Sequence, residues 1–302
     1  MITRDLYYQH SGRVELKGLL FILLAAPITT LILGFIYGYA IAYIPFIYLN
    51  FLLTIGFGFA SGFVTGMAGY FGKIRNTGFM VGAGILTGLL AEYFGWVYWL
   101  YAFTDEELLV YAPFDLLYYI GQVAENGAWS IGSATPTGWF LVLIWVIEAL
   151  IIIGAATLAA MGPTSDVPYC EECDAWTDDE AIGTEIQSLD DNHALVNSLE
   201  QGNYDLLKYL KPITDPMEKS LNVTIRNCPK CDNSWYIGIE EMTPKLNKKN
   251  EVEHDTNNVV KNLSIHGEVA RDLKIWAQKM REGVFFGEEK EADDADNSST
   301  TA

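Results

Sequence analysis

Positive charge is scarce in this sequence. Its 302 residues include 19 Lys and Arg against 38 Asp and Glu, for a formal net charge of −19. Phosphate binding needs clustered Lys and Arg, so this balance disfavours a nucleic acid as the main partner. The chain also lacks a P-loop, a nucleophile elbow, an H-E-x-x-H motif and a dinucleotide-binding glycine fingerprint. These absences favour a non-enzymatic protein.

Lys and Arg are absent from four long apolar runs in the first half of the chain. Residues 1–161 hold 5 Lys and Arg against 9 Asp and Glu, whereas residues 162–302 hold 14 against 29, giving net charges of −4 and −15. Each apolar run exceeds the roughly 20 residues that cross a bilayer. We predict a four-span transmembrane α-helical bundle in residues 1–161, with spans at about 18–42, 44–70, 78–101 and 139–161.

Charge in the loops predicts the orientation of these spans. Basic residues occur before the first span and between the second and third, at Arg4, Arg13, Lys17, Lys73 and Arg75. Residues 102–138 contain no Lys or Arg, and Pro113 there is placed to open a short helix. Positively charged segments stay in the cytoplasm. We therefore predict a multi-pass cell-membrane protein, as in a bacterial inner membrane, with both termini cytoplasmic and residues 102–138 outside.

Glycines recur at four-residue intervals within the spans. Small residues on one helix face let two backbones approach closely. The spacing predicts tight packing within the bundle, and the alternative is a homo-oligomer, such as a pore, formed through these faces. The glycines concerned are Gly34 and Gly38, Gly58, Gly62 and Gly66, Gly78 and Gly82, and Gly84 and Gly88.

Two acids, Glu92 and Glu148, lie inside predicted spans, which contain no Lys, Arg or His. A bare carboxylate in a bilayer costs several kcal/mol, so each should be protonated or paired. One interpretation is a protonated acid hydrogen-bonded to a neighbouring helix, with Ser61, Thr65, Thr87 or a tyrosine as partner. The alternatives are proton or ion handling and intramembrane catalysis, although no second acid lies three or four residues away.

The chain has only four cysteines, and all of them follow the last span. They form two C-x-x-C pairs, Cys170 with Cys173 and Cys228 with Cys231. Two such pairs in a reducing compartment predict one tetrahedral Zn²⁺ site with a structural role. Iron bound by the same four thiolates and a redox-active dithiol remain as alternatives.

The paired cysteines and their flanking strands resemble the zinc-ribbon class. A β-rich run enters the second pair at 221–227, and another leaves it at 234–239. Ribbons often place glycine after the second cysteine of a pair, where a positive φ is needed, and here Asp174 and Asp232 occupy these positions. The overall layout resembles multi-pass bacterial membrane proteins that carry a cytoplasmic zinc ribbon and have no assigned function.

We predict a small cytoplasmic α+β zinc-ribbon-like domain over residues 162–286. The cysteine pairs are separated by 54 residues, and we interpret 175–220 as a helical insertion with short helices at 190–200 and 203–210. Residues 267–281 have the apolar period of an amphipathic helix, which packs on the sheet or offers a groove to a partner. The acidic residues 287–302 have the composition of a disordered tail.

Three functions remain from the sequence. The first is a non-enzymatic membrane protein that presents a structural-zinc module to a protein partner at the cytoplasmic face. The second is a small channel or proton-coupled carrier that uses Glu148 and Glu92. The third is a membrane-bound C-x-x-C redox protein. The four histidines, His10, His193, His254 and His266, have no ligand spacing and are expected to be solvent-exposed.

Overall fold

The computed structural model describes residues 6–44, 46–130 and 135–283. The chain divides into two compact units. The helical unit comprises His10–Val167, and the sheet unit comprises the described residues of 1–9 and 168–302. The predicted disordered tail, 287–302, and Pro45 lie outside the described residues.

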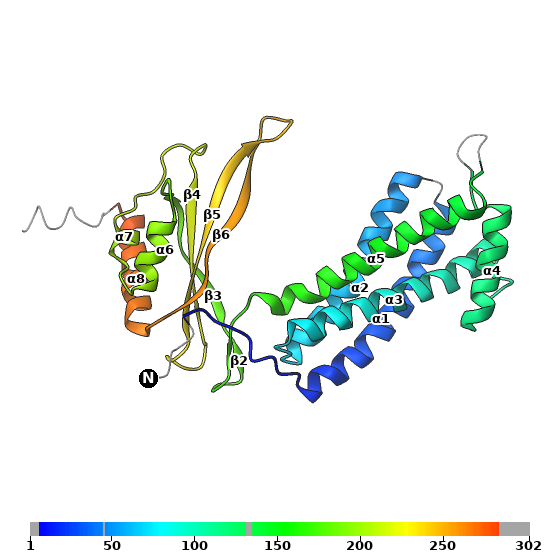
Figure 1. Ribbon diagram of the computed structural model, residues 1–302, viewed down its shortest axis with the longest axis horizontal. Coiled ribbons are helices and arrows are strands. Elements are labelled where there is room, and N and C mark those ends of the chain that lie inside the picture. Colours follow the sequence, from blue (N-terminus) through cyan, green and yellow to red (C-terminus); the bar gives the residue numbers. More distant parts are fainter. Residues whose placement is uncertain (1–5, 45, 131–134, 284–302) are drawn as a thin grey trace, which may run out of the picture. The chain divides into compact units, whose positions relative to one another are not determined.

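Four long helices form the helical unit (Figure 1). All four are long and apolar enough to cross a membrane. They confirm the four predicted apolar helices, with bounds that differ by no more than four residues at either end. A fifth, shorter helix begins at Pro113, as predicted. The long helices are α1 (Leu16–Tyr43), α2 (Ile47–Phe71), α3 (Thr77–Phe103) and α5 (Gly138–Ser165), and the short one is α4 (Pro113–Asn126).

Glycines let these helices approach closely. A Cβ added at Gly62 of α2 would lie 2.0 Å from the carbonyl oxygen of Ala156 in α5. A Cβ at Gly38 of α1 would lie 2.5 Å from the backbone nitrogen of Trp99 in α3. Gly82 is different, because nothing lies within 4 Å of its added Cβ. Gly62 and Gly38 therefore have the predicted role, since each lets two helices of the same chain pack closely.

A four-stranded antiparallel sheet with the order β3-β4-β5-β6 forms the sheet unit. Three helices cover one of its faces (Figure 1). Helix α8 spans the predicted residues and packs Leu273 and Trp276 into the core, so it lies on the sheet. The elements are β3 (Asp178–Gln187), β4 (Ser220–Asn227), β5 (Trp235–Leu246), β6 (Val252–Ile265), α6 (His193–Glu200), α7 (Asp205–Lys208) and α8 (Gly267–Arg281).

The segment between the cysteine pairs, 175–220, differs from the predicted helical insertion. It begins with strand β2 (Ala175–Trp176) and then β3, which were not predicted, whereas the two short helices predicted at 190–200 and 203–210 are present as α6 and α7. The apolar anchors of β3, Ile182 and Ile186, are four residues apart. That spacing places two side chains on one face of either a helix or a strand, so the pattern does not distinguish them.

Residues 6–9, which precede the first long helix, belong to the sheet unit. Tyr7 forms an isolated antiparallel bridge with Leu263 of β6. The amide of Tyr8 donates to the carbonyl of Asn262 at 2.9 Å, and the amide of Ser264 donates to that of Leu6 at 2.9 Å. This short segment therefore extends the sheet beyond β6.

Candidate metal centre and bundle cavity

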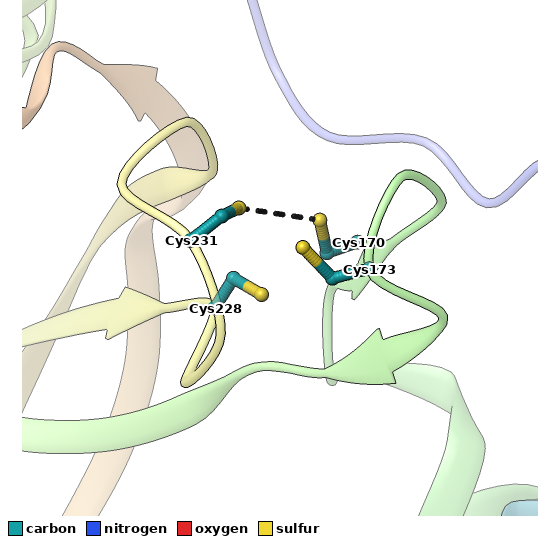
Figure 2. A group of neighbouring side chains, drawn as sticks. All are labelled: Cys170, Cys173, Cys228 and Cys231. Atoms are coloured by element: carbon teal, nitrogen blue, oxygen red, sulfur yellow. Dashed lines mark hydrogen bonds between the residues drawn. The ribbon is translucent and has the colours of Figure 1, made fainter.

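The four cysteine side chains converge on one point (Figure 2). Cys170 ends strand β1 (Tyr169–Cys170), and Cys173 lies in the turn that leads to β2. The other two lie in the turn between β4 and β5. The four Sγ atoms all lie within 4.8 Å of one another. The two pairs that the sequence predicted to form one site are thus brought together.

The separation of the sulfur atoms fits a tetrahedral metal site. Zinc–sulfur bonds of about 2.3 Å give tetrahedral sulfur–sulfur edges of about 3.8 Å. The Sγ atoms of Cys170 and Cys231 lie 3.7 Å apart. A disulfide would need about 2.05 Å, and all four cysteines are free. The cluster therefore has the dimensions of a metal centre, and four thiolates suit zinc or iron.

Hydrogen bonds and backbone conformation shape the two cysteine turns. The amide of Lys230 donates to Cys228 Sγ at 3.4 Å, and the Ser234 hydroxyl donates to Cys170 Sγ at 3.3 Å. Asp174 has φ +52°, the left-handed conformation expected after the first pair. Asp232 does not adopt a positive φ, so that expectation was wrong for the second pair.

The Asp232 side chain instead joins the second turn to helix α8 and strand β5. Its Oδ2 accepts a 2.7 Å hydrogen bond from Arg271, and its Oδ1 accepts one of 3.0 Å from the Trp235 indole. The Arg271 hydrogen bond lowers the pKa of Asp232. These contacts link the second cysteine turn to the core of the sheet unit.

The thiols of the cluster differ in pKa. Burial opposes ionisation of Cys170, but hydrogen bonds from Ser234, the Cys173 backbone and the other thiols lower its pKa to about 7. Hydrogen bonding, chiefly with Cys231, raises the pKa of Cys173 to about 12. Burial raises the pKa of Cys228. The Cys170 thiolate thus forms readily, and a bound cation would be needed to stabilise the thiolates of Cys173 and Cys228 at neutral pH.

Among the described residues, these cysteines are the one group of three or more His, Cys, Asp or Glu side chains arranged to hold a metal. The histidines contribute nothing to it. His10 differs from the expected exposed residue, because it is partly buried in the helical unit. Burial lowers its pKa, against hydrogen bonds with the backbone of Ser165 and Thr164.

A cavity of about 450 Å³ lies within the helical unit. All four long helices contribute to its wall, and the loop after α4 adds Ala128, Trp129 and Ser130. Glu92 from α3 and Glu148 from α5 both line it. The two predicted intramembrane acids therefore share one chamber, which the sequence alone did not indicate.

Each acid has a neutral hydrogen-bond donor. The Tyr37 hydroxyl donates to Glu148 and lies 3.0 Å from the Thr54 hydroxyl, while the Trp96 indole donates to Glu92 at 2.7 Å. A tyrosine was among the partners that the sequence suggested. Ser61, Thr65 and Thr87, which the sequence also suggested, are not partners of either acid. The hydroxyls of Thr65 and Thr87 lie 2.9 Å apart and pair with each other. Ser61 Oγ has no partner among the described residues.

Comparison with protein families, curated proteins and solved structures finds no match to this chain. Inferences about its function therefore depend on the thiol cluster and the cavity. The thiol cluster provides four ligands and no open coordination position. The cavity provides carboxylates within an otherwise largely apolar wall.

Proposed function

We propose that the protein is a non-enzymatic integral membrane protein whose sheet unit is stabilised by one structural Zn²⁺ and is presented to a protein partner at the cytoplasmic face. The observation that carries this proposal is the convergence of four free thiols within 4.8 Å. We also propose that the two cysteine turns and their flanking strands form a zinc-ribbon-like structure.

A structural role fits the donor set better than a catalytic one. Four thiolates complete a tetrahedron, so no position remains for water or substrate. Cys170 and Cys228 are each only 2% exposed. Iron in the same ligand set and a redox dithiol are the competing proposals. Convergence of both pairs favours a metal over a dithiol, since a dithiol needs only one pair.

The N-terminal segment pairs with β6. This pairing supports a topology in which the start of α1 and the end of α5 lie on the same side of the membrane. Residues 6–8 precede α1 and residues 252–265 follow α5, yet both belong to the sheet unit. An even number of spans satisfies this pairing. The basic residues before α1 and between α2 and α3 favour the cytoplasm for that side. A cysteine introduced at the exposed Gln122 of α4 should react with an impermeant maleimide from outside intact cells.

The surface charge favours a basic partner. Residues 162–302 carry a net charge of −15, which steers positively charged surfaces toward this region. Extraction in mild detergent should therefore yield a co-purifying protein that is released by added salt.

Cys228→Ser should abolish that co-purification while the protein remains in the membrane fraction, since the four apolar helices precede the metal centre. Gln9→Ala, an exposed change outside the cluster, is the matched control. Unchanged co-purification with Cys228→Ser would contradict the proposed role of the metal in presenting the surface.

A second proposed function is a proton-coupled carrier. Its support is the shared cavity, in which Glu92 and Glu148 have neutral donors and, among the described residues, no Lys, Arg or His in the wall. Flux in proteoliposomes under a pH gradient tests it. Glu148→Gln should abolish flux, and Glu125→Gln, a change at an exposed acid of α4, should not.

A further inference from the structure

The cavity has an aromatic wall of fixed geometry. The indole rings of Trp96 and Trp145 meet edge to face, with centroids 4.8 Å apart and an interplanar angle of 86°. Trp99 adds a second edge-to-face contact with Trp96 at 5.3 Å and 80°. Tyr37 stacks on Phe57 at 4.4 Å, which holds the phenol beside Glu148. The wall is therefore preorganised, and about 450 Å³ is within the range of small-molecule sites.

The two carboxyl groups in this wall have no cationic partner among the described residues. The donors to Glu92 and Glu148 are an indole N–H and a phenol O–H, both of which are neutral. In the described part of the chain, no cationic side chain lines the cavity. Aromatic faces attract cations through the negative potential of the ring. Carboxylates and indoles together thus provide both kinds of group that stabilise a positive charge away from water.

An unpaired acceptor also lies in the wall. The Asn50 side chain donates through Nδ2 to the carbonyl of Ile44 at 3.3 Å, but its buried Oδ1 has no hydrogen-bond partner among the described residues. A buried acceptor without a partner costs roughly 1–3 kcal/mol. An N–H or polarised C–H of a cationic ligand would meet this need. Among the described residues the site thus lacks positive charge, and it has an acceptor that no donor in the wall uses.

The apolar wall distinguishes an organic cation from a metal ion. Calcium or magnesium takes six or more oxygen ligands at short distances, in an environment rich in carboxylates and water. Here most of the wall is hydrocarbon and aromatic ring, contributed by Ile41, Phe51, Trp129, Ile144 and Ile151 among others. Such a wall favours a cation that carries its own apolar substituents.

We propose that this cavity binds a monovalent organic cation with aromatic or branched alkyl groups, held between Glu92, Glu148 and the tryptophan rings. The proposal concerns the same cavity as the second proposed function and names a ligand class for it, but it concerns binding rather than flux. Binding and flux are therefore measured separately, so that either can fail alone.

Two probes of matching shape and opposite charge test the proposal. Tetraphenylphosphonium and tetraphenylborate are titrated into the full-length protein in detergent, with tryptophan fluorescence and calorimetry as readouts. Tetraphenylphosphonium should bind saturably with one site per chain and quench the fluorescence of the wall. Tetraphenylborate should show only the non-saturable partitioning seen with empty micelles. Equal saturable binding of both ions, or no saturable binding of the phosphonium, would overturn the proposal.

Variants locate the binding. Glu148→Gln and Glu92→Gln should each weaken phosphonium binding at least tenfold, whereas Glu148→Asp, which keeps the charge, should lose less. Glu125→Gln lies outside the cavity and should leave binding unchanged. Size-exclusion profiles identify variants that fail to fold. Unchanged affinity in a folded Glu92→Gln, Glu148→Gln double variant would overturn the proposal. Phosphonium binding without ion flux would support it and contradict the carrier function.

Discussion

The Tyr7 hydroxyl donates a 2.7 Å hydrogen bond to Oε1 of Glu200, which lies 193 residues further along the chain. Burial and the neighbouring carboxylate raise the pKa of Tyr7 to about 12. The Tyr7 ring also packs against the core of the sheet unit. The short segment before α1 is therefore a structural part of the sheet unit, although the whole helical bundle separates it from β6 in sequence.

Removing the Tyr7 side chain should loosen the end of β6. Tyr7→Phe keeps the ring and loses one hydrogen bond to an exposed carboxylate, so it should cost about 1 kcal/mol. Tyr7→Ala also loses apolar contacts and should cost at least about 2 kcal/mol. Hydrogen exchange of peptides covering 258–265 should be faster in Tyr7→Phe than in the unmodified protein and faster still in Tyr7→Ala. It should stay unchanged in Gln9→Ala. Equal exchange in Tyr7→Ala and the unmodified protein would mean that the segment does not pair with β6.

The hydrogen bond from Tyr37 to Glu148 should contribute measurably to the stability of the helical unit. Tyr37→Phe preserves stacking on Phe57 but removes the donor to a carboxylate within the bundle, a loss of about 1–3 kcal/mol. Glu148→Gln keeps a hydrogen-bonding shape and should cost less. Thermal unfolding in detergent of both single variants and the double variant gives the coupling free energy.

The exposed pair of Tyr39 and Glu106, joined by a 2.8 Å hydrogen bond, is the matched control for this cycle. Tyr39→Phe should change stability by less than about 0.5 kcal/mol, because water replaces the lost partner. If Tyr37→Phe were as mild as Tyr39→Phe, Glu148 would not depend on Tyr37.

Glycine contacts between helices predict opposite effects for two similar substitutions. Gly62→Ala would bring its Cβ to 2.0 Å from the Ala156 carbonyl oxygen, so α2 and α5 must separate, at a cost of about 1–3 kcal/mol. Gly82→Ala meets nothing within 4 Å and should stabilise α3 by up to about 1 kcal/mol. The melting temperature of each variant in one detergent checks both. A neutral Gly62→Ala would contradict the close approach of α2 and α5.

Several of these features could be predicted from the sequence because they depend on local pattern. Bilayer thickness sets a minimum length for an apolar helix, which made the four long helices recognisable. Helix α8 matched its prediction because its apolar face repeats at the helical period. The spacing within each C-x-x-C pair indicated the thiol cluster, since neighbouring thiolates at that spacing converge on one ion.

Features formed by residues far apart in sequence could not be predicted in this way. Strand β3 has only Ile182 and Ile186 as apolar anchors, and its identity as a strand depends on pairing with β4. Tyr37 and Glu148 are 111 residues apart, so neither sequence neighbourhood indicates the other. The cavity likewise forms only where the four long helices pack together.

Zinc affinity should depend steeply on pH. Zinc binds thiolates, whereas the metal-free cluster holds protons on Cys173 and Cys228, whose pKa values are raised. Binding therefore releases protons, and the apparent affinity should fall as the pH decreases from about 8 to about 6. Because the pKa of Cys173 is about 12, affinity should keep rising above pH 8.5, where ordinary thiols level off. Competition with a chromophoric chelator across this range measures it, and a flat profile would contradict thiolate ligation.

The metal content of the purified full-length protein tests the central claim most directly. Elemental analysis, after removal of any affinity tag, should find one zinc and no iron per chain, and X-ray absorption should show four sulfur neighbours at about 2.3 Å. Cys228→Ser should lose the zinc while still inserting into the membrane. A metal-free protein whose thiols cycle between dithiol and disulfide, or a zinc content unchanged by Cys228→Ser, would contradict a structural zinc site at these four cysteines.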